Sequence, residues 1–370
     1  MSTGQIYCIS LNSHHNHIIF YAMYQSSDSI NEITQLKQQY TTTTTTIHRH
    51  VSKIHSVRCN SNNTILATAS HDKTINLYDI THTNNTFIHI TQLQVHTNSV
   101  ECICWNYNNE KMFISGSSDK TVRLYDLTQS NTKSIYTIST PGENILLSWS
   151  TDSRYIVIGD KKNYITLIDY NMLSSSHNSD GNKHAIITTK QYTNEINDIQ
   201  LIYSNLLQSH ILLCATDVGT IDIYKYNDLS TCIYSHHCHS TAIYSCTYNL
   251  HGNILASGGA DSLVQLWSLQ SMNNICTYSR CESSISCISI STNNKLIAIG
   301  SEDKRIDISY LSNGTHIYTI NTLADIDSIQ FIYNNKLDQY TIIYSEDELN
   351  RNNIGKLYCV QFTHNDTSKT

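Results

Sequence analysis

The stretch that decides the fold is CHSTAIYSCTYNLHGNILASGGADSLVQLWSL, residues 238–269. It contains two cysteines, two histidines, a glycine pair, an aspartate and a tryptophan. Taken alone, these residue types are compatible with a metal site, a catalytic site or a purely structural element. The meaning of the stretch depends on whether it is unique in the chain or one copy of a repeat.

Two other stretches, residues 49–80 and 95–127, follow the same order of residue types. Each has a histidine at its second position and continues through an apolar strand, a polar turn and a small-residue strand to an aspartate. The histidine precedes the aspartate by 22 or 23 residues, and an aromatic residue follows the aspartate six residues later. The pairs are His50–Asp72, His96–Asp119 and His239–Asp261. The stretch is therefore one copy of a repeat.

Weaker copies of the repeat continue along the chain at a similar spacing. The positions that correspond to the repeat aspartate are Asp72, Asp119, Lys162, Val218, Asp261, Asp303 and Asp347. The one long interval contains the polar segment 172–184, which is predicted to be an exposed insertion loop. Each copy has about four short alternating strands. A single four-stranded sheet buries too little surface, whereas seven sheets arranged radially bury both faces of each sheet.

This pattern resembles the WD40 propeller family, in which a histidine, a serine or threonine, an aspartate and a tryptophan form a hydrogen-bonded tetrad. His239, Ser257, Asp261 and Trp267 match all four roles. Two further sets have tyrosine in place of tryptophan, so their networks are expected to be incomplete. These sets are His50, Thr68, Asp72 and Tyr78, and His96, Ser115, Asp119 and Tyr125. The resemblance implies an all-β, seven-bladed WD40 β-propeller.

The resemblance also suggests boundaries for the parts of the chain. Residues 41–362 are expected to form the propeller, between an N-terminal extension at 1–40 and a C-terminal tail at 363–370. The threonine tract at residues 41–46 lies where a propeller needs the strand that closes its ring. β-branched threonine is typical of strands, so the tract is predicted to be either that closing strand or a flexible linker.

Composition and charge argue against several classes of function. The net charge is −7 and no run of lysine or arginine is present, which disfavours direct binding to nucleic acid. No segment resembles a signal peptide or a membrane helix, so no membrane association is expected. The 12 cysteines are scattered singly and are interpreted as reduced thiols.

Two chemical interpretations of the opening stretch are possible but disfavoured. Ser257, His239 and Asp261 could form a catalytic triad, but an enzyme has no need of three copies of its active site. Cys232, Cys238 and the neighbouring histidines could bind zinc, but their spacing is not that of paired zinc ligands. We therefore expect no catalytic residue, no metal, no cofactor and no small-molecule substrate.

Three segments that depart from the repeat resemble a narrower family, the WD40 subunits of THO complexes. They are TPGENILLSWSTDSRYIVIGDKKNYITLID at 140–169, TNEINDIQL at 193–201 and GSEDKRIDISYLSNG at 300–314. The resemblance implies a non-enzymatic scaffold in the nucleus that couples transcription to mRNA processing and export. It also implies contacts with other THO/TREX subunits, especially a large helical scaffold subunit, and indirect association with mRNA.

Two other classes of propeller are weighed against this interpretation. A substrate receptor of a cullin ubiquitin ligase would often carry Trp-Asp-x-Arg after a blade, but YDIT, YDLT and WSLQ stand there and lack the arginine. A propeller enzyme would need a cluster of acids or metal ligands at its central channel, and no such cluster is evident in the sequence.

A partner-binding face is predicted on the loops that precede the first strand of each blade and on the aspartate turns. Its members are expected to be exposed and to differ from the repeat consensus, because loop residues can vary without loss of fold stability. They are Lys53, His55, His71, Asn98, Glu101, Glu143, Asn144, Asn194, Glu195, Tyr244 and Glu302. The start of the third blade has lost its histidine, which indicates either a binding constraint or simple degeneration of that blade.

Overall fold

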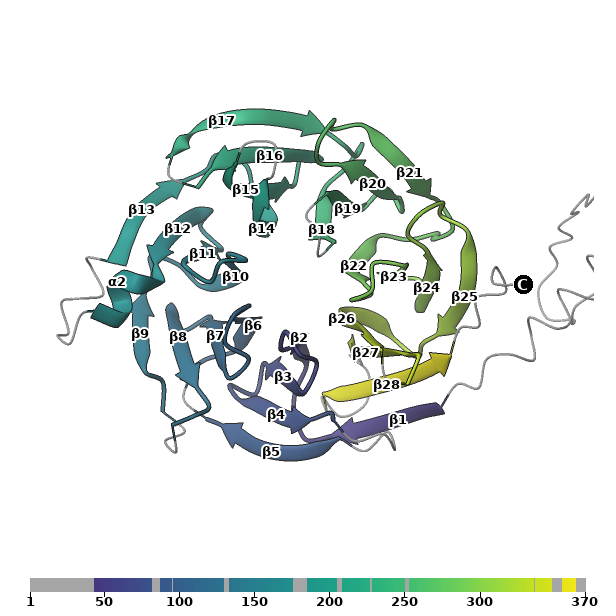
Figure 1. Ribbon diagram of the computed structural model, residues 1–370, viewed down its shortest axis with the longest axis horizontal. Coiled ribbons are helices and arrows are strands. Elements are labelled where there is room, and N and C mark those ends of the chain that lie inside the picture. The colour runs from purple at the N-terminus through teal and green to yellow at the C-terminus, as the bar shows by residue number, and fades with distance from the viewer. Residues whose placement is uncertain are drawn as a thin grey trace, which may run out of the picture.

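The structure, a computed structural model, forms a closed ring of β-sheets around a central axis (Figure 1). It describes residues 43–81, 87–94, 96–129, 133–175, 185–204, 208–226, 228–249, 253–335, 337–347 and 355–363. Within them, the strands form seven four-stranded antiparallel sheets. The prediction of an all-β, seven-bladed β-propeller is confirmed.

Six blades are each built from four consecutive strands, which follow one another from the inside of the ring outward. Blade 1 has β2 (Ile54–Cys59), β3 (Ile65–Ser70), β4 (Ile75–Asp79) and β5 (Ile88–Leu93); blade 2 has β6 (Val100–Trp105), β7 (Met112–Ser117), β8 (Thr121–Asp126) and β9 (Tyr136–Ser139); blade 3 has β10 (Asn144–Trp149), β11 (Tyr155–Asp160), β12 (Tyr164–Asp169) and β13 (Ile186–Gln191). Blade 4 has β14 (Ile196–Ser204), β15 (Ser209–Thr216), β16 (Thr220–Lys225) and β17 (Asp228–His237); blade 5 has β18 (Ile243–Tyr248), β19 (Ile254–Gly259), β20 (Val264–Ser268) and β21 (Asn274–Tyr278); blade 6 has β22 (Ile285–Ile290), β23 (Leu296–Ser301), β24 (Arg305–Tyr310) and β25 (His316–Asn321).

Blade 7 joins the two ends of the propeller. Its inner strands are β26 (Asp325–Asn334), β27 (Gln339–Asp347) and β28 (Lys356–Thr363), and its outermost strand is β1 (Thr43–His48). β1 pairs antiparallel with β28, from Thr43 opposite Gln361 to His48 opposite Lys356. The threonine tract therefore supplies the closing strand, and the alternative of a flexible linker at these positions is wrong.

The hydrophobic core lies between neighbouring blades rather than at the centre of the ring. One cluster, for example, combines Val157 and Leu167 of blade 3 with Ile199 and Leu212 of blade 4. Small residues on the second strand of a blade permit this close approach. A Cβ added at Gly258 would lie 2.5 Å from the Cγ2 of Ile285 in the next blade.

Side chains on the inner strands connect successive blades around the axis. Ser148 Oγ accepts a hydrogen bond from the backbone N–H of Leu201 at 2.8 Å, and Asp198 Oδ2 accepts one from Cys246 at 2.7 Å. Equivalent bonds run from Phe331 to Ser289 at 3.0 Å and from Val57 to Ser328 at 3.1 Å. An inner strand has an unpaired edge, so these bonds satisfy N–H groups that the sheet leaves free.

The structure corrects part of the predicted insertion loop at 172–184. Its first residues belong to the short helix α2 (Tyr170–Ser175), and Leu173 is fully buried against the cluster that contains Trp149. An apolar side chain at that position stabilises helix rather than exposed loop. Residues 176–184, the predicted extension at 1–40 and the tail beyond Thr363 lie outside the described residues, while β28 extends one residue past the predicted end at 362.

Candidate functional site

The predicted tetrads all lie at one end of the ring, which we call the tetrad face. This face consists of the connections that lead to each inner strand and the turns between the second and third strands of each blade. In blade 5, His239 Nδ1 lies 2.9 Å from Asp261 Oδ1 and its Nε2 lies 2.8 Å from Ser257 Oγ. The indole Nε1 of Trp267 donates to Ser257 Oγ at 3.1 Å. All four predicted residues are therefore joined in one network.

Gly259, the second of the glycine pair, makes room for this network. A Cβ at that position would lie 2.6 Å from His239 Nδ1 and 2.7 Å from Asp261 Oδ1. An ionised carboxylate only accepts hydrogen bonds, so the Nδ1 of His239 carries the proton and Nε2 accepts from the serine hydroxyl.

Blade 1 repeats the histidine geometry with a different outer partner. His50 Nδ1 lies 2.9 Å from Asp72 Oδ2, and its Nε2 lies 2.8 Å from Thr68 Oγ1. The side-chain amide of Asn76 adds a contact of 3.1 Å to the same Nε2. Tyr78 is buried beside this group, and burial raises the pKa of its phenol to about 12.

Blade 2 brings His96, Ser115 and Asp119 together but leaves its tyrosine out. His96 Nδ1 lies 2.9 Å from Asp119 Oδ2 and Nε2 lies 2.7 Å from Ser115 Oγ. The hydroxyl of Tyr125 is buried and makes no hydrogen bond within the described part of the chain, unlike the indole N–H of Trp267. A phenol hydroxyl lies at a different position from an indole N–H, so Tyr125 does not reproduce the fourth contact.

Burial and hydrogen bonding act in opposite directions on the pKa values of two tetrad carboxylates, those of blades 1 and 2. Burial disfavours the charged form of Asp72, but hydrogen bonds from His50, Thr74 and the backbone of Val51 lower its pKa to about 2. Asp119 also has a pKa of about 2, for the corresponding reasons. Each carboxylate therefore stays ionised at neutral pH and accepts the bonds that hold its turn.

The arrangement of Ser257, His239 and Asp261 has the distances of a nucleophile, a base and an orienting acid. Ser257 is 0% exposed, however, and its Oγ already contacts both His239 and Trp267. A substrate carbon cannot reach an oxygen enclosed in this way. The geometry supports a structural role for all three residues.

The start of blade 3, Gly142-Glu143-Asn144, is held by a different set of contacts. A Cβ at Gly142 would lie 2.6 Å from the Oδ2 of Asp160, so a larger residue there would have to displace this carboxylate. The other carboxylate oxygen of Asp160 accepts hydrogen bonds from the backbone of Lys162 and Tyr164, at 2.9 and 3.0 Å. Asp160 Oδ2, which faces the glycine, is buried and has no hydrogen-bond partner among the described residues, so the lost histidine is not replaced as a donor.

The prediction that Asn144 is an exposed partner-binding residue is wrong. Asn144 is 0% exposed, and its Nδ2 donates to the carbonyl of Ser117 in blade 2 at 3.3 Å. Asn144 is the first residue of β10, where the strand already packs against the preceding blade. Glu143 beside it is accessible and forms an ion pair with Lys161 at 2.7 Å.

Four of the predicted partner residues lie together near the inner edge of blades 1 and 2. Lys53 Nζ forms ion pairs with Asp327 at 2.9 Å and Asp347 at 2.6 Å, which connects blade 1 to blade 7. The ring of His55 lies 5.9 Å from that of His71, and its Nε2 lies 3.7 Å from Glu101. The remaining predicted residues lie elsewhere on the same face, at blades 2 to 6. They are Asn98, Glu143, Asn194, Glu195, Tyr244 and Glu302.

Sequence reasoning missed the acidic partners of Lys53. Burial raises the pKa of Asp327 to about 6, although Lys53 opposes this shift. The signal that could have found them is the pair Asp325 and Asp327 at the start of an inner strand, where acidic side chains are uncommon without a cation nearby.

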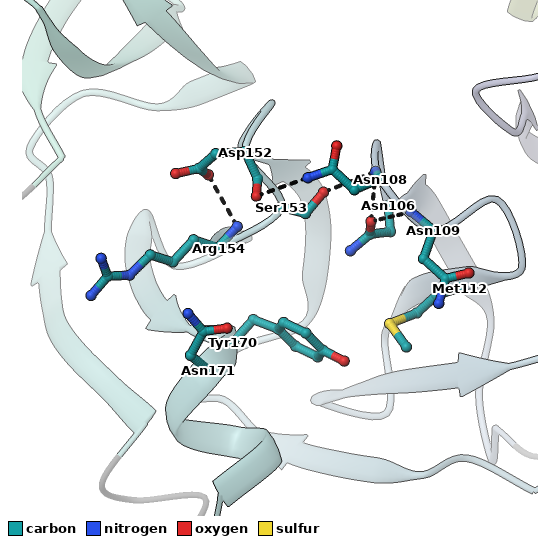
Figure 2. Close-up of a pocket in the computed structure, with 9 residues that line it drawn as sticks. All are labelled: Asn106, Asn108, Asn109, Met112, Asp152, Ser153, Arg154, Tyr170 and Asn171. Carbon is teal, nitrogen blue, oxygen red and sulfur yellow. Dashed lines mark hydrogen bonds between the residues drawn. The ribbon is translucent and has the colours of Figure 1, made fainter.

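The opposite face carries a polar pocket of about 260 Å³ between blades 2 and 3, shown in Figure 2. Its polar groups are largely engaged in turns. Asn106 Oδ1 accepts from the backbone of Asn108 and Asn109, and Asn108 Nδ2 donates to the carbonyl of Asp152. The guanidinium of Arg154 pairs with Asp169 at 3.1 Å. These bonds indicate that the pocket wall supports the fold.

The described residues also bear on the predictions about metal binding and membrane segments. In the described ranges, no cluster of three or more histidine, cysteine or acidic side chains is placed to hold a metal ion. Cys232 and His236 lie on strand β17 rather than in a closed knuckle. No helix among the described residues has the length and apolarity needed to cross a membrane.

Comparison with known proteins extends this picture. The family described as "WD domain, G-beta repeat" matches residues 41–79, 87–126, 230–268 and 272–308. Each match contains the outermost strand of one blade and the first three strands of the next. The chain is a seven-bladed β-propeller that contains WD40 repeats. Its first two matched segments carry the tyrosine tetrads and the third carries the tryptophan tetrad.

Two curated proteins are similar to this WD40 propeller. "THO complex subunit 3" from Arabidopsis thaliana is 27% identical over 282 residues, which cover 76% of this chain and 84% of that protein. "WD repeat-containing protein AAC3" from Dictyostelium discoideum is 29% identical over 207 residues, which cover 54% of this chain and 39% of that protein. The first of these proteins is named as a subunit of a complex, and the second is named only as a protein with WD repeats.

Proposed function

We propose that this propeller is a non-catalytic scaffold subunit of a nuclear THO complex, where it couples transcription to mRNA processing and export through protein contacts. The observation that carries the proposal is the similarity to "THO complex subunit 3", which extends over 84% of that protein. The segments at 140–169, 193–201 and 300–314, which depart from the generic repeat, support the same assignment.

The proposed partners are the other THO/TREX subunits, with mRNA bound indirectly. The net charge of −7 suits a subunit that contacts protein rather than an RNA backbone. A large helical scaffold subunit is proposed to dock on the tetrad face, where Glu143, Asn194 and Glu195 are accessible on the connections that enter blades 3 and 4. Rigid strands hold these loops in place, which favours specific docking.

Affinity purification of the tagged full chain from nuclear extract, followed by mass spectrometry, tests the assignment. We expect THO/TREX subunits among the co-purified proteins. A triple variant with Glu143→Ala, Asn194→Ala and Glu195→Ala should lose the large helical subunit while its thermal melt stays unchanged. Asn144 is left intact because it is buried and structural.

A matched triple variant on the opposite face serves as the control, with Asn62→Ala, Glu110→Ala and Lys295→Ala. It should retain the helical subunit. Recovery of a cullin assembly in place of THO subunits would refute the proposed function. Recovery of THO subunits that the tetrad-face variant leaves undiminished would refute only the choice of face.

A further inference from the structure

A hollow of about 290 Å³ lies between blade 1 and blade 2, and the role proposed above does not use it. Its lining includes Ile90, Thr91 and Leu93 of β5, the outermost strand of blade 1. It also includes Leu127, Gln129 and Lys133, which come between β8 and β9 of blade 2 in the sequence. Its apolar lining comes from four aliphatic side chains. They are Ile65, Ile90, Leu93 and Leu127. We name this feature the rim groove.

The apolar surface of the rim groove extends onto the outside of β5. Ile90 is 49% exposed and Ile88, two residues earlier on the same face of the strand, is 48% exposed. Burial of such surface against a partner contributes about 25 cal/mol per Å². Contiguous aliphatic side chains that remain exposed beside a hollow are typical of protein docking sites.

Two lysines border the apolar floor. Lys111 and Lys133 both line the rim groove and are exposed, and neither ammonium group forms an ion pair or hydrogen bond with any described residue. The carboxylate in the lining, Asp126, already accepts hydrogen bonds from the backbone and hydroxyl of Thr128, at 2.9 and 2.7 Å. With two lysines and one aspartate in its lining, the groove carries one excess positive charge on a propeller whose net charge is −7.

The backbone beside the groove favours an extended ligand. Within the described residues, β5 pairs with β4 alone, so its outer edge keeps unpaired N–H and C=O groups. An extended segment can pair with such an edge while alternate side chains enter the hollow. Side chains on one face of that segment would then enter the apolar hollow, and those on its other face would contact the lysines.

We propose that the rim groove docks a short, extended segment of a partner protein in which aliphatic and acidic residues alternate. The aliphatic side chains fill the hollow between Ile90, Leu93 and Leu127, and the carboxylates pair with Lys111 and Lys133. The site is separate from the tetrad face, so the propeller holds two partners at once. This inference does not depend on membership of a THO complex.

Fluorescence anisotropy with the full chain tests the proposal. The probe is a labelled synthetic peptide that alternates leucine with aspartate and glutamate. We expect saturable binding that weakens as salt increases, because the ion pairs are exposed. The double variant Lys111→Glu, Lys133→Glu and the single variant Ile90→Ser should each weaken binding by at least about tenfold.

Three controls make the result decisive. Ile187→Ser, at an isoleucine that is 46% exposed on the outermost strand of blade 3, should bind the peptide like the original chain. A peptide with lysine at every acidic position should not bind. The thermal melts of all variants should agree with that of the original chain, since the altered side chains are exposed. Absence of binding, equal binding of the lysine peptide, or loss of binding in Ile187→Ser would each overturn the proposal.

Discussion

At the scale of single residues, the tetrads show how polar groups specify a β-rich fold. His239 is 2% exposed and Ser257 is 0% exposed, yet each makes the hydrogen bonds that its burial requires. A buried polar group without a partner costs about 1–3 kcal/mol. The network therefore contributes chiefly through what its loss would leave unsatisfied.

Asp261→Ala is expected to lower the free energy of unfolding by about 2–4 kcal/mol, because His239 and the turn lose their acceptor while remaining buried. Thermal or denaturant unfolding measures this change. Asp217→Ala is the matched control, since Asp217 occupies the corresponding turn of blade 4, is exposed and has no tetrad around it. A melt of Asp261→Ala within a degree of the original chain would contradict the structural role of the tetrad.

Asp198 on inner strand β14 gives a prediction about pH. Burial raises its pKa to about 6, although hydrogen bonds from the backbone of Cys246 and Ile199 oppose the shift. A carboxyl group with a raised folded-state pKa stabilises the fold below its unfolded pKa of about 3.9, and this contribution is lost as pH rises through 6.

The variant Asp198→Asn cannot ionise at this position. The free energy of unfolding of the original chain, measured relative to that of the variant, should therefore fall between pH 4 and pH 7. Urea unfolding at several pH values measures the difference, and Asp222→Asn, on the outer part of the same blade, is the control. A constant difference across this range would show that Asp198 does not titrate between the two states.

The residues of the tetrads could be found from sequence because their spacing is fixed by turn geometry. Asn144 could not, because its exposure depends on how β10 packs against Ser117 of the neighbouring blade. The same holds for Asp327, whose contact with Lys53 joins residues at opposite ends of the propeller sequence. The alternation of residues along a strand and the repeat interval of about forty residues carry no information about which side chains meet between blades.

At the scale of strands and helices, the residue types within each segment were enough to predict most of the strands. The small residues of β19 and the threonines of β1 both indicated strands, and the structure contains them. Helix α2 was missed because six residues are too few for a helical period to be recognised. Its only clear sign is Leu173, one apolar side chain in a polar segment, and burial of that side chain is a tertiary effect.

Removal of residues 1–30 is expected to leave a folded propeller, whereas removal of residues 1–48 should abolish cooperative unfolding. The longer deletion removes β1 and exposes the edge of β28 along the whole register from Thr43 to His48. Circular dichroism melts and size-exclusion chromatography distinguish the two outcomes. A soluble chain of residues 49–370 with a cooperative melt would show that β1 is dispensable for ring closure.

At the scale of the whole molecule, the number of blades followed from the repeat interval, and the ring followed from the need to bury both faces of each sheet. The hydrogen bonds that join neighbouring blades could not be predicted from the sequence. Ser148, Ser289 and Ser328 are ordinary strand serines in the sequence, and only the ring places each beside a backbone N–H of the next blade. These contacts depend on curvature, which a one-dimensional pattern does not encode.

The pairing of β1 with β28 also determines when the ring can close during synthesis. β1 is the first described strand to leave the ribosome, and its partner is the last. At about 5–20 residues per second, translation separates the two by some tens of seconds. Blades 1 to 6 can assemble on the nascent chain during that interval, while β1 has no strand to pair with until β28 is synthesised. Closure therefore cannot precede the synthesis of β28, and a factor that shields an unpaired strand would act on β1 until then.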